Sequence, residues 1–185
     1  MVWEKLIWHK LHVPRHYVIS WITVLDRRPT KAWLAYFGIA LNDMCLFGCD
    51  GVETRNRVFL GCEFSRSIWN QVLSMCGLPR SAMDWEQELH WLVTRLKGKS
   101  LLLIILKLAR NAILDMVWRQ KNAGVFHRVT LTVDQVVVPI KDIIAIILKR
   151  KNVNFVDVVN RRLCIEWGIG IGLFFWLVFI DVVGW

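Results

Sequence analysis

Three cysteines, Cys45, Cys49 and Cys62, constrain this chain of 185 residues more than any other feature. Three residues separate the first pair, and a loop containing Gly, Asp and Asn leads to the third. This layout is typical of a metal-binding knuckle, because a tight turn brings the thiols to one side of a tetrahedral ion. We therefore predict an irregular cysteine knuckle with these three residues as metal ligands. The alternative is that three reduced thiols are simply small buried residues.

Outside this loop, apolar residues recur at intervals of three and four, which predicts helices. Thr30 and Asp84 are typical helix caps, and Ser65 is a further candidate cap. Pro14 is expected to direct the chain away from helix after the first segment. The expected helices cover residues 1–12, 17–25, 30–37, 65–76, 84–98, 100–126, 133–148 and 152–165.

The stretch 129–138 is rich in β-branched residues and also suits a strand. We favour a helix there, because the alternation of a strand is poor and the helical spacing continues through Pro139. The fold class is thus mainly α, with a short irregular cysteine knuckle between helices and a helical region after it. Gly, Pro and Ser at 77–83 suggest a boundary. The predicted division is a knuckle-like domain over 1–77, a helical region over 78–165 and an apolar tail over 166–185.

Composition sets broad limits on function. The chain is 55% hydrophobic, contains 11 tryptophans and carries a formal charge of +9, which suits contact with phosphates or an anionic membrane surface. Five cysteines without a secretory signal predict a reducing, intracellular compartment, with nucleus and cytoplasm both open. Residues 169–180 contain no charge, so a membrane tail over 169–185 competes with a packed or disordered segment.

The order of residues around the cysteines resembles a known family, the zinc-binding domain that follows the reverse transcriptase in plant LINE-type non-LTR retrotransposons. Weaker likeness extends from Trp3 to Leu34 and recurs between Trp118 and Phe126. The residues that carry the central resemblance are Cys45, Cys49, Glu53-Thr54-Arg55-Asn56-Arg57, Phe59, Cys62, Phe64, Ser65-Arg66 and Trp69.

The resemblance implies a zinc site in which Arg57 stands at the position of the family's histidine ligand, and the first cysteine pair is one residue further apart than usual. An arginine cannot replace histidine, because its guanidinium stays protonated and has no free lone pair. The fourth ligand is therefore missing. Asp50, Glu53, a water or Cys76 are the candidates for it, and His9, His12 and His16 are weaker ones.

The resemblance also implies binding of RNA or DNA beside the polymerase. Arg27, Arg28, Lys31 and Arg66 are the candidate contacts, since they lie close to the most recognisable family residues; ordinary solvated charges are the alternative. No small-molecule substrate is expected. The paired carboxylates of a polymerase, in an aromatic-x-Asp-Asp motif, do not occur in these 185 residues, which predicts a non-catalytic protein. The rival is a structural or membrane-associated protein, or a translated relic, without a nucleic-acid role.

Overall fold

The computed structural model describes residues 3–11, 13–40, 42–127, 131–149 and 157–170. Within these ranges the chain is mainly helical, as predicted, and its β-pairing is limited to an isolated bridge between Met44 and Val52. The elements are α1 (Glu4–Ile7), α2 (Pro14–Val24), α3 (Lys31–Tyr36), the π-helix η1 (Arg57–Gly61), α4 (Glu63–Met75), α5 (Trp85–Arg95), α6 (Leu101–His127), α7 (Val133–Leu148) and α8 (Val158–Trp167).

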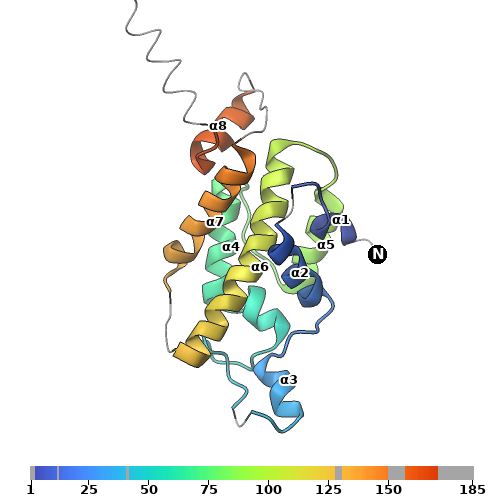
Figure 1. Cartoon of the computed structure of the whole chain (residues 1–185), viewed down its shortest axis with the longest axis vertical. Helices are drawn as coiled ribbons and strands as arrows, with labels where there is room; N and C mark the ends of the chain where they lie inside the picture. Colours follow the sequence, from blue (N-terminus) through green and yellow to red (C-terminus); the bar gives the residue numbers. More distant parts are fainter. Residues whose placement is uncertain (1–2, 12, 41, 128–130, 150–156, 171–185) are drawn as a thin grey trace, which may run out of the picture.

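The long helix α6 runs through the centre of the molecule (Figure 1). It contacts α2 on one side and α4 and α7 on the other, while α8 lies at one end and α3 projects at the opposite end (Figure 1). Ile105, Ala109 and Val117 of α6 are fully buried. Helix α4 contributes Ile68 and Leu73 to the same core. The helices before and after the loop 77–83 therefore bury one hydrophobic core.

Several predicted helix boundaries are confirmed. The side chains of Thr30 and Asp84 accept hydrogen bonds from the backbone N–H groups of Trp33 and Gln87, which caps α3 and α5. Helix α7 contains Pro139 in its interior, so the helix prediction for 133–148 is correct and the strand alternative is wrong for residues 133–138. The helix predicted over 152–165 is confirmed in its described part by α8; residues 150–156 lie outside the description.

Three helix bounds in the N-terminal half differ from the prediction. The first helix covers only Glu4–Ile7 of the predicted 1–12. The chain is non-helical just before Pro14, as expected, since Val13 is extended, but Pro14 itself occupies the first turn of α2, where its missing N–H costs nothing. Ser65 is not the cap of α4, which begins at Glu63 with Cys62 as its N-cap. The hydroxyl of Ser65 is buried and donates to the Cys62 carbonyl at 3.1 Å.

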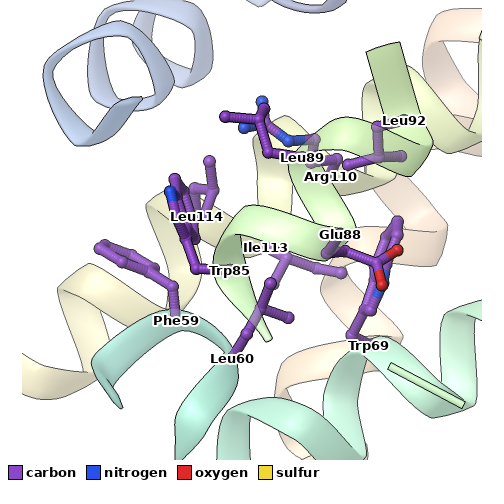
Figure 2. Close-up of a pocket in the computed structure, with 10 residues that line it drawn as sticks. All are labelled: Phe59, Leu60, Trp69, Trp85, Glu88, Leu89, Leu92, Arg110, Ile113 and Leu114. Carbon is purple, nitrogen blue, oxygen red and sulfur yellow. The ribbon is translucent and has the colours of Figure 1, made fainter. Parts of the chain in front are cut away.

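A small cavity of about 20 Å³ lies in the core between η1, α4, α5 and α6 (Figure 2). Glu88 lines it and is held by a two-fold hydrogen bond from Arg80, at 2.7 and 2.8 Å. Burial lowers the pKa of the neighbouring Arg110 to about 10, so this guanidinium stays charged near neutral pH. A cavity of this size holds about one water molecule.

Trp167 and Ile169 are buried at the end of α8, and Gly168 ends that helix in the left-handed conformation. None of the helices within the described residues combines the length and the hydrophobicity that a membrane crossing requires. The rest of the predicted apolar tail, residues 171–185, lies outside the description.

Candidate metal centre

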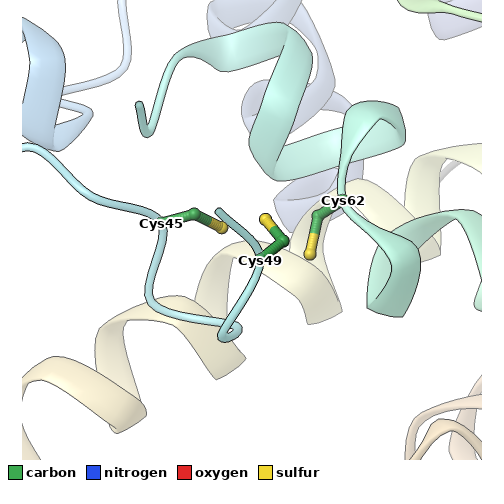
Figure 3. Close-up of side chains that lie close together, drawn as sticks. All are labelled: Cys45, Cys49 and Cys62. Atoms are coloured by element: carbon green, nitrogen blue, oxygen red, sulfur yellow. The ribbon is translucent and has the colours of Figure 1, made fainter. Parts of the chain in front are cut away.

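The three predicted thiols come together between the knuckle loop and the start of α4 (Figure 3). The sulfur atoms of Cys45, Cys49 and Cys62 all lie within 4.8 Å of one another. Sulfur ligands bind zinc at about 2.3 Å, which places them about 3.8 Å apart around a tetrahedral ion. Small side-chain movements would therefore bring all three onto one ion. The chemistry and spacing of these donors fit zinc.

Backbone hydrogen bonds fold the knuckle loop onto itself. The Cys45 N–H donates to the Gly51 carbonyl at 2.8 Å, and the Glu53 N–H donates to the Asp43 carbonyl at 2.7 Å. Gly48 has φ +74°, a conformation that side chains rarely adopt. The loop therefore returns Cys49 to Cys45 with three residues between them, and the extra residue does not separate the thiols.

The three thiols form hydrogen bonds with one another, and these bonds shift their pKa values in different directions. The pKa of Cys62 is lowered, chiefly by the hydrogen bond with Cys45, and the pKa of Cys45 is raised by the same hydrogen bond and by burial. Burial raises the pKa of Cys49, and the charge of Arg57 opposes that shift. Cys62 is therefore the thiol that gives up its proton most readily, and metal binding would release the protons that the thiols still hold.

Arg57 braces the knuckle instead of supplying a ligand. Its Nη2 donates to the Asp50 carbonyl at 2.7 Å and its Nη1 to the Gly61 carbonyl at 3.2 Å. The guanidinium thus connects the loop after Cys49 to the turn before α4. A Cβ at position 51 would lie 2.0 Å from Nη2, so Gly51 leaves the room that the Arg57 side chain needs.

The described candidates for the fourth ligand are not grouped with the three thiols. Glu53 is fully buried, and its Oε1 accepts from the Lys31 N–H at 2.9 Å and lies 3.3 Å from the Lys121 Nζ. Cys76 belongs to the hydrophobic core, where burial raises its pKa to about 12. Asp50, His9 and His16 are described but are not among the residues grouped with the thiols, and His12 lies outside the description. In the described part of the chain, the three cysteines make up the whole cluster.

The four candidate nucleic-acid contacts have different surroundings. Arg27 is exposed. The Arg28 guanidinium lies over the Trp118 ring at 4.6 Å. Lys31 Nζ donates to the Met44 carbonyl at 2.9 Å, and Arg66 Nε donates to the Leu60 carbonyl at 3.3 Å. Three of the four thus make intramolecular contacts, and a role in binding RNA or DNA stays a prediction for all of them.

Sequence reasoning missed the buried polar contacts that join α6 to the knuckle and to α2. Lys121 is buried between Glu53 and the Pro29 carbonyl, and its Nζ lies 4.6 Å from the centre of the Trp118 ring. Asp115 is also buried and lies 3.0 Å from Arg15 of α2. The available signal was charged residues on the apolar helix α6, because such residues are rarely buried unless they are paired.

The comparison with known families locates the same region. Residues 1–69 match a family model described as zinc-binding in reverse transcriptase. The matched segment contains the three thiols and Arg57, and it ends within α4. No curated protein and no solved structure matches the chain. The match and the cysteine cluster together support a zinc-binding domain of the reverse-transcriptase type in the N-terminal part of the chain.

Proposed function

We propose that residues 1–69 form a zinc-dependent nucleic-acid-binding module, and that the chain is a non-catalytic remnant of a reverse-transcriptase polyprotein from a plant LINE-type non-LTR retrotransposon. The observation that carries the proposal is the convergence of three thiols, within 4.8 Å, inside the segment that matches the family model. The order of residues around them supports the retrotransposon type.

In this proposal Cys45, Cys49 and Cys62 hold zinc, and a solvent molecule completes the set of ligands. Bound zinc would cross-link the loop to the start of α4 and so stabilise the knuckle. Arg57 fixes the same two segments through the Asp50 and Gly61 carbonyls. The thiols and the guanidinium therefore act together to hold the knuckle in one conformation.

Phosphate contacts supply the affinity of the proposed module for nucleic acid. For each phosphate that the protein neutralises, the slope of log K against log salt concentration becomes more negative by about 0.7 for single strands and by about 0.9 for duplexes. Titrating labelled single- and double-stranded RNA and DNA at two salt concentrations tests this directly. We expect measurable binding at low salt that weakens steeply as salt rises. Absence of binding at low salt would refute the proposed function.

The exposed Arg27 gives a sharper version of the test. Arg27→Glu should weaken binding and reduce its salt slope, because a phosphate contact is replaced by repulsion. Lys97→Glu is the matched control, since Lys97 is also exposed but lies outside the matched segment. Equal effects of the two charge reversals would mean that the module has no localised phosphate contact at Arg27.

A further inference from the structure

Helix α3 and its C-cap residue, Phe37, present three aromatic rings to solvent. Trp33 is 47% exposed, Tyr36 84% and Phe37 56%, and none of the residues of α3 is buried. The rings form one cluster, with centroids 4.5 Å apart for Trp33 and Phe37 and 5.1 Å apart for Tyr36 and Phe37. Helix α3 projects at the end of the molecule opposite α8 (Figure 1). An exposed aromatic cluster of this kind marks an interaction surface.

The base of α3 is fixed although its rings are exposed. Thr30 caps the helix, and the N–H groups of Lys31 and Ala32 donate to the Glu53 side chain and carbonyl at 2.9 and 3.3 Å. Glu53 is itself paired with the buried Lys121 of α6. The backbone that carries the rings is therefore already ordered. Binding of a partner to them costs little conformational entropy in this segment.

The charges around α3 favour an anionic partner. From Arg27 to Asn42 the sequence contains three basic residues and no acidic one. Asp26 and Asp43 flank this stretch in sequence, so residues 26–43 together keep a net charge of +1. Asp26 lies 3.9 Å from Arg55, and Glu53 is buried beside Lys121, so these two carboxylates already face a cation. Aromatic rings beside net positive charge are the combination that binds single-stranded nucleic acid, in which unpaired bases stack on the rings.

We propose that α3 is a base-stacking platform for single-stranded RNA or DNA, in which Trp33, Tyr36 and Phe37 stack on unpaired bases and Arg27 contacts the backbone phosphate. This inference rests on the proposed nucleic-acid function and specifies the class of nucleic acid that is bound. Duplexes bind this platform less well, because their bases are already stacked within the helix.

The test compares two labelled oligonucleotides that have the same phosphates, an oligothymidylate of about twelve nucleotides and an abasic strand of the same length. The full-length wild-type chain should prefer the strand with bases. The triple variant Trp33→Ala, Tyr36→Ala, Phe37→Ala should lose about tenfold or more in affinity for that strand, because each stacked base contributes substantially, and should bind the abasic strand unchanged. Trp33→Phe should retain most of the preference.

Trp21→Ala is the matched control, because Trp21 is 41% exposed but lies on α2. It should leave both affinities unchanged. The single variant Tyr36→Ala removes the most exposed ring and keeps the test valid if the triple variant loses helical structure. Its expected result is a smaller loss that is again confined to the strand with bases.

The outcomes separate the platform from the proposed function. If wild type binds neither strand, the nucleic-acid function itself fails. If wild type binds both strands equally and the triple variant changes neither affinity, phosphate binding stands and the platform is refuted. If the triple variant instead loses only binding to phosphatidylserine vesicles, or only self-association in sedimentation, the surface serves a membrane or a second copy and the platform is likewise refuted.

Discussion

The knuckle, residues 45–62, and the helical body, formed by α4, α6 and α7, are stabilised in different ways. The body buries apolar side chains of α4, α6 and α7 against one another, so that its stability is spread over many contacts. The loop that carries Cys45 and Cys49 is held by a few backbone hydrogen bonds and by the Arg57 guanidinium. Single polar substitutions should therefore act most strongly in the knuckle, whereas the body should respond mainly to loss of apolar volume.

The two regions meet at a buried ion pair, Glu53 with Lys121, at 3.3 Å. Breaking a buried pair leaves a charge without compensation, which costs far more than breaking an exposed pair. Glu53 also accepts a hydrogen bond from the N–H at the start of α3. The contact therefore connects the knuckle, α3 and α6.

The largest effect is expected for Glu53→Ala, which leaves the buried Lys121 ammonium without a carboxylate, although it keeps the Pro29 carbonyl and the Trp118 ring. We expect the free energy of unfolding to fall by about 3–5 kcal/mol in urea titrations. Glu86→Ala is the control, because its pair with Arg55 at 2.8 Å is on the surface and should cost about 0–1 kcal/mol. A double variant, Glu53→Leu with Lys121→Met, should recover much of the loss. Equal costs for Glu53→Ala and Glu86→Ala would show that the buried pair does not join the two regions.

A smaller loss is expected for Ile140→Ala in the body. Ile140 of α7 is fully buried, so its truncation removes apolar contacts and leaves a cavity, at a cost of about 2–5 kcal/mol in the free energy of unfolding. Ile146→Ala on the exposed face of the same helix should stay within about 0.5 kcal/mol. Similar urea midpoints for the two variants would mean that α7 is not part of the cooperative core.

The helical body was largely predictable because apolar spacing and caps are local signals. Thr30 and Asp84 occupy the cap positions that their sequence context indicates, and Thr132 adds a capping box that starts α7 before Pro139. Pro14 was expected to interrupt helix, which it does, but a proline also suits the first turn of the next helix, and that position was not predicted. Local sequence alone does not distinguish these two positions.

The knuckle was predictable only in part. The spacing of the three cysteines indicated that the thiols would meet, and the chemistry of arginine excluded Arg57 as a ligand. Its two hydrogen bonds to the Asp50 and Gly61 carbonyls depend on the folded loop and have no sequence signal. The same limit applies to Lys31, whose ammonium donates to a backbone carbonyl. The sequence reports a charge but not the group that the charge contacts.

The metal centre gives the next prediction, with a smaller expected effect. Wild type should lose zinc in a chelator wash, because three thiolates and solvent leave an open position. Arg57→His adds a fourth ligand type and should retain about one equivalent of zinc per chain. Arg57→Gln is the control, since it removes the charge without adding an imidazole.

Zinc content measured in parallel on the three purified proteins tests whether Arg57 stands where a fourth ligand is missing. If wild type retains a full equivalent and Arg57→His adds nothing, another ligand already closes the site. If none of the three retains zinc, the loop between Cys45 and Cys49 does not support a tetrahedral ion. If Arg57→Gln retains as much as Arg57→His, removal of the charge matters more than the new ligand.

The smallest effect is expected for pH, at the contact between α2 and α6. His16 is buried with its Nε2 3.8 Å from Asp115, and Arg15 and Arg119 lie against the same carboxylate. Burial lowers the pKa of His16 below its ordinary value of 6.5; Asp115 opposes this shift, and the two arginines add to it. The unfolded chain therefore binds the proton first, so the stabilising contribution of neutral His16 is complete above pH 6.5 and is lost as pH falls through the folded pKa.

Urea midpoints at pH 7.5 and 5.5 should fall less with acid in His16→Gln than in wild type, whereas the exposed His90→Gln should behave as wild type. An unchanged acid dependence in His16→Gln would show that this histidine is not what couples the packing of α2 on α6 to pH.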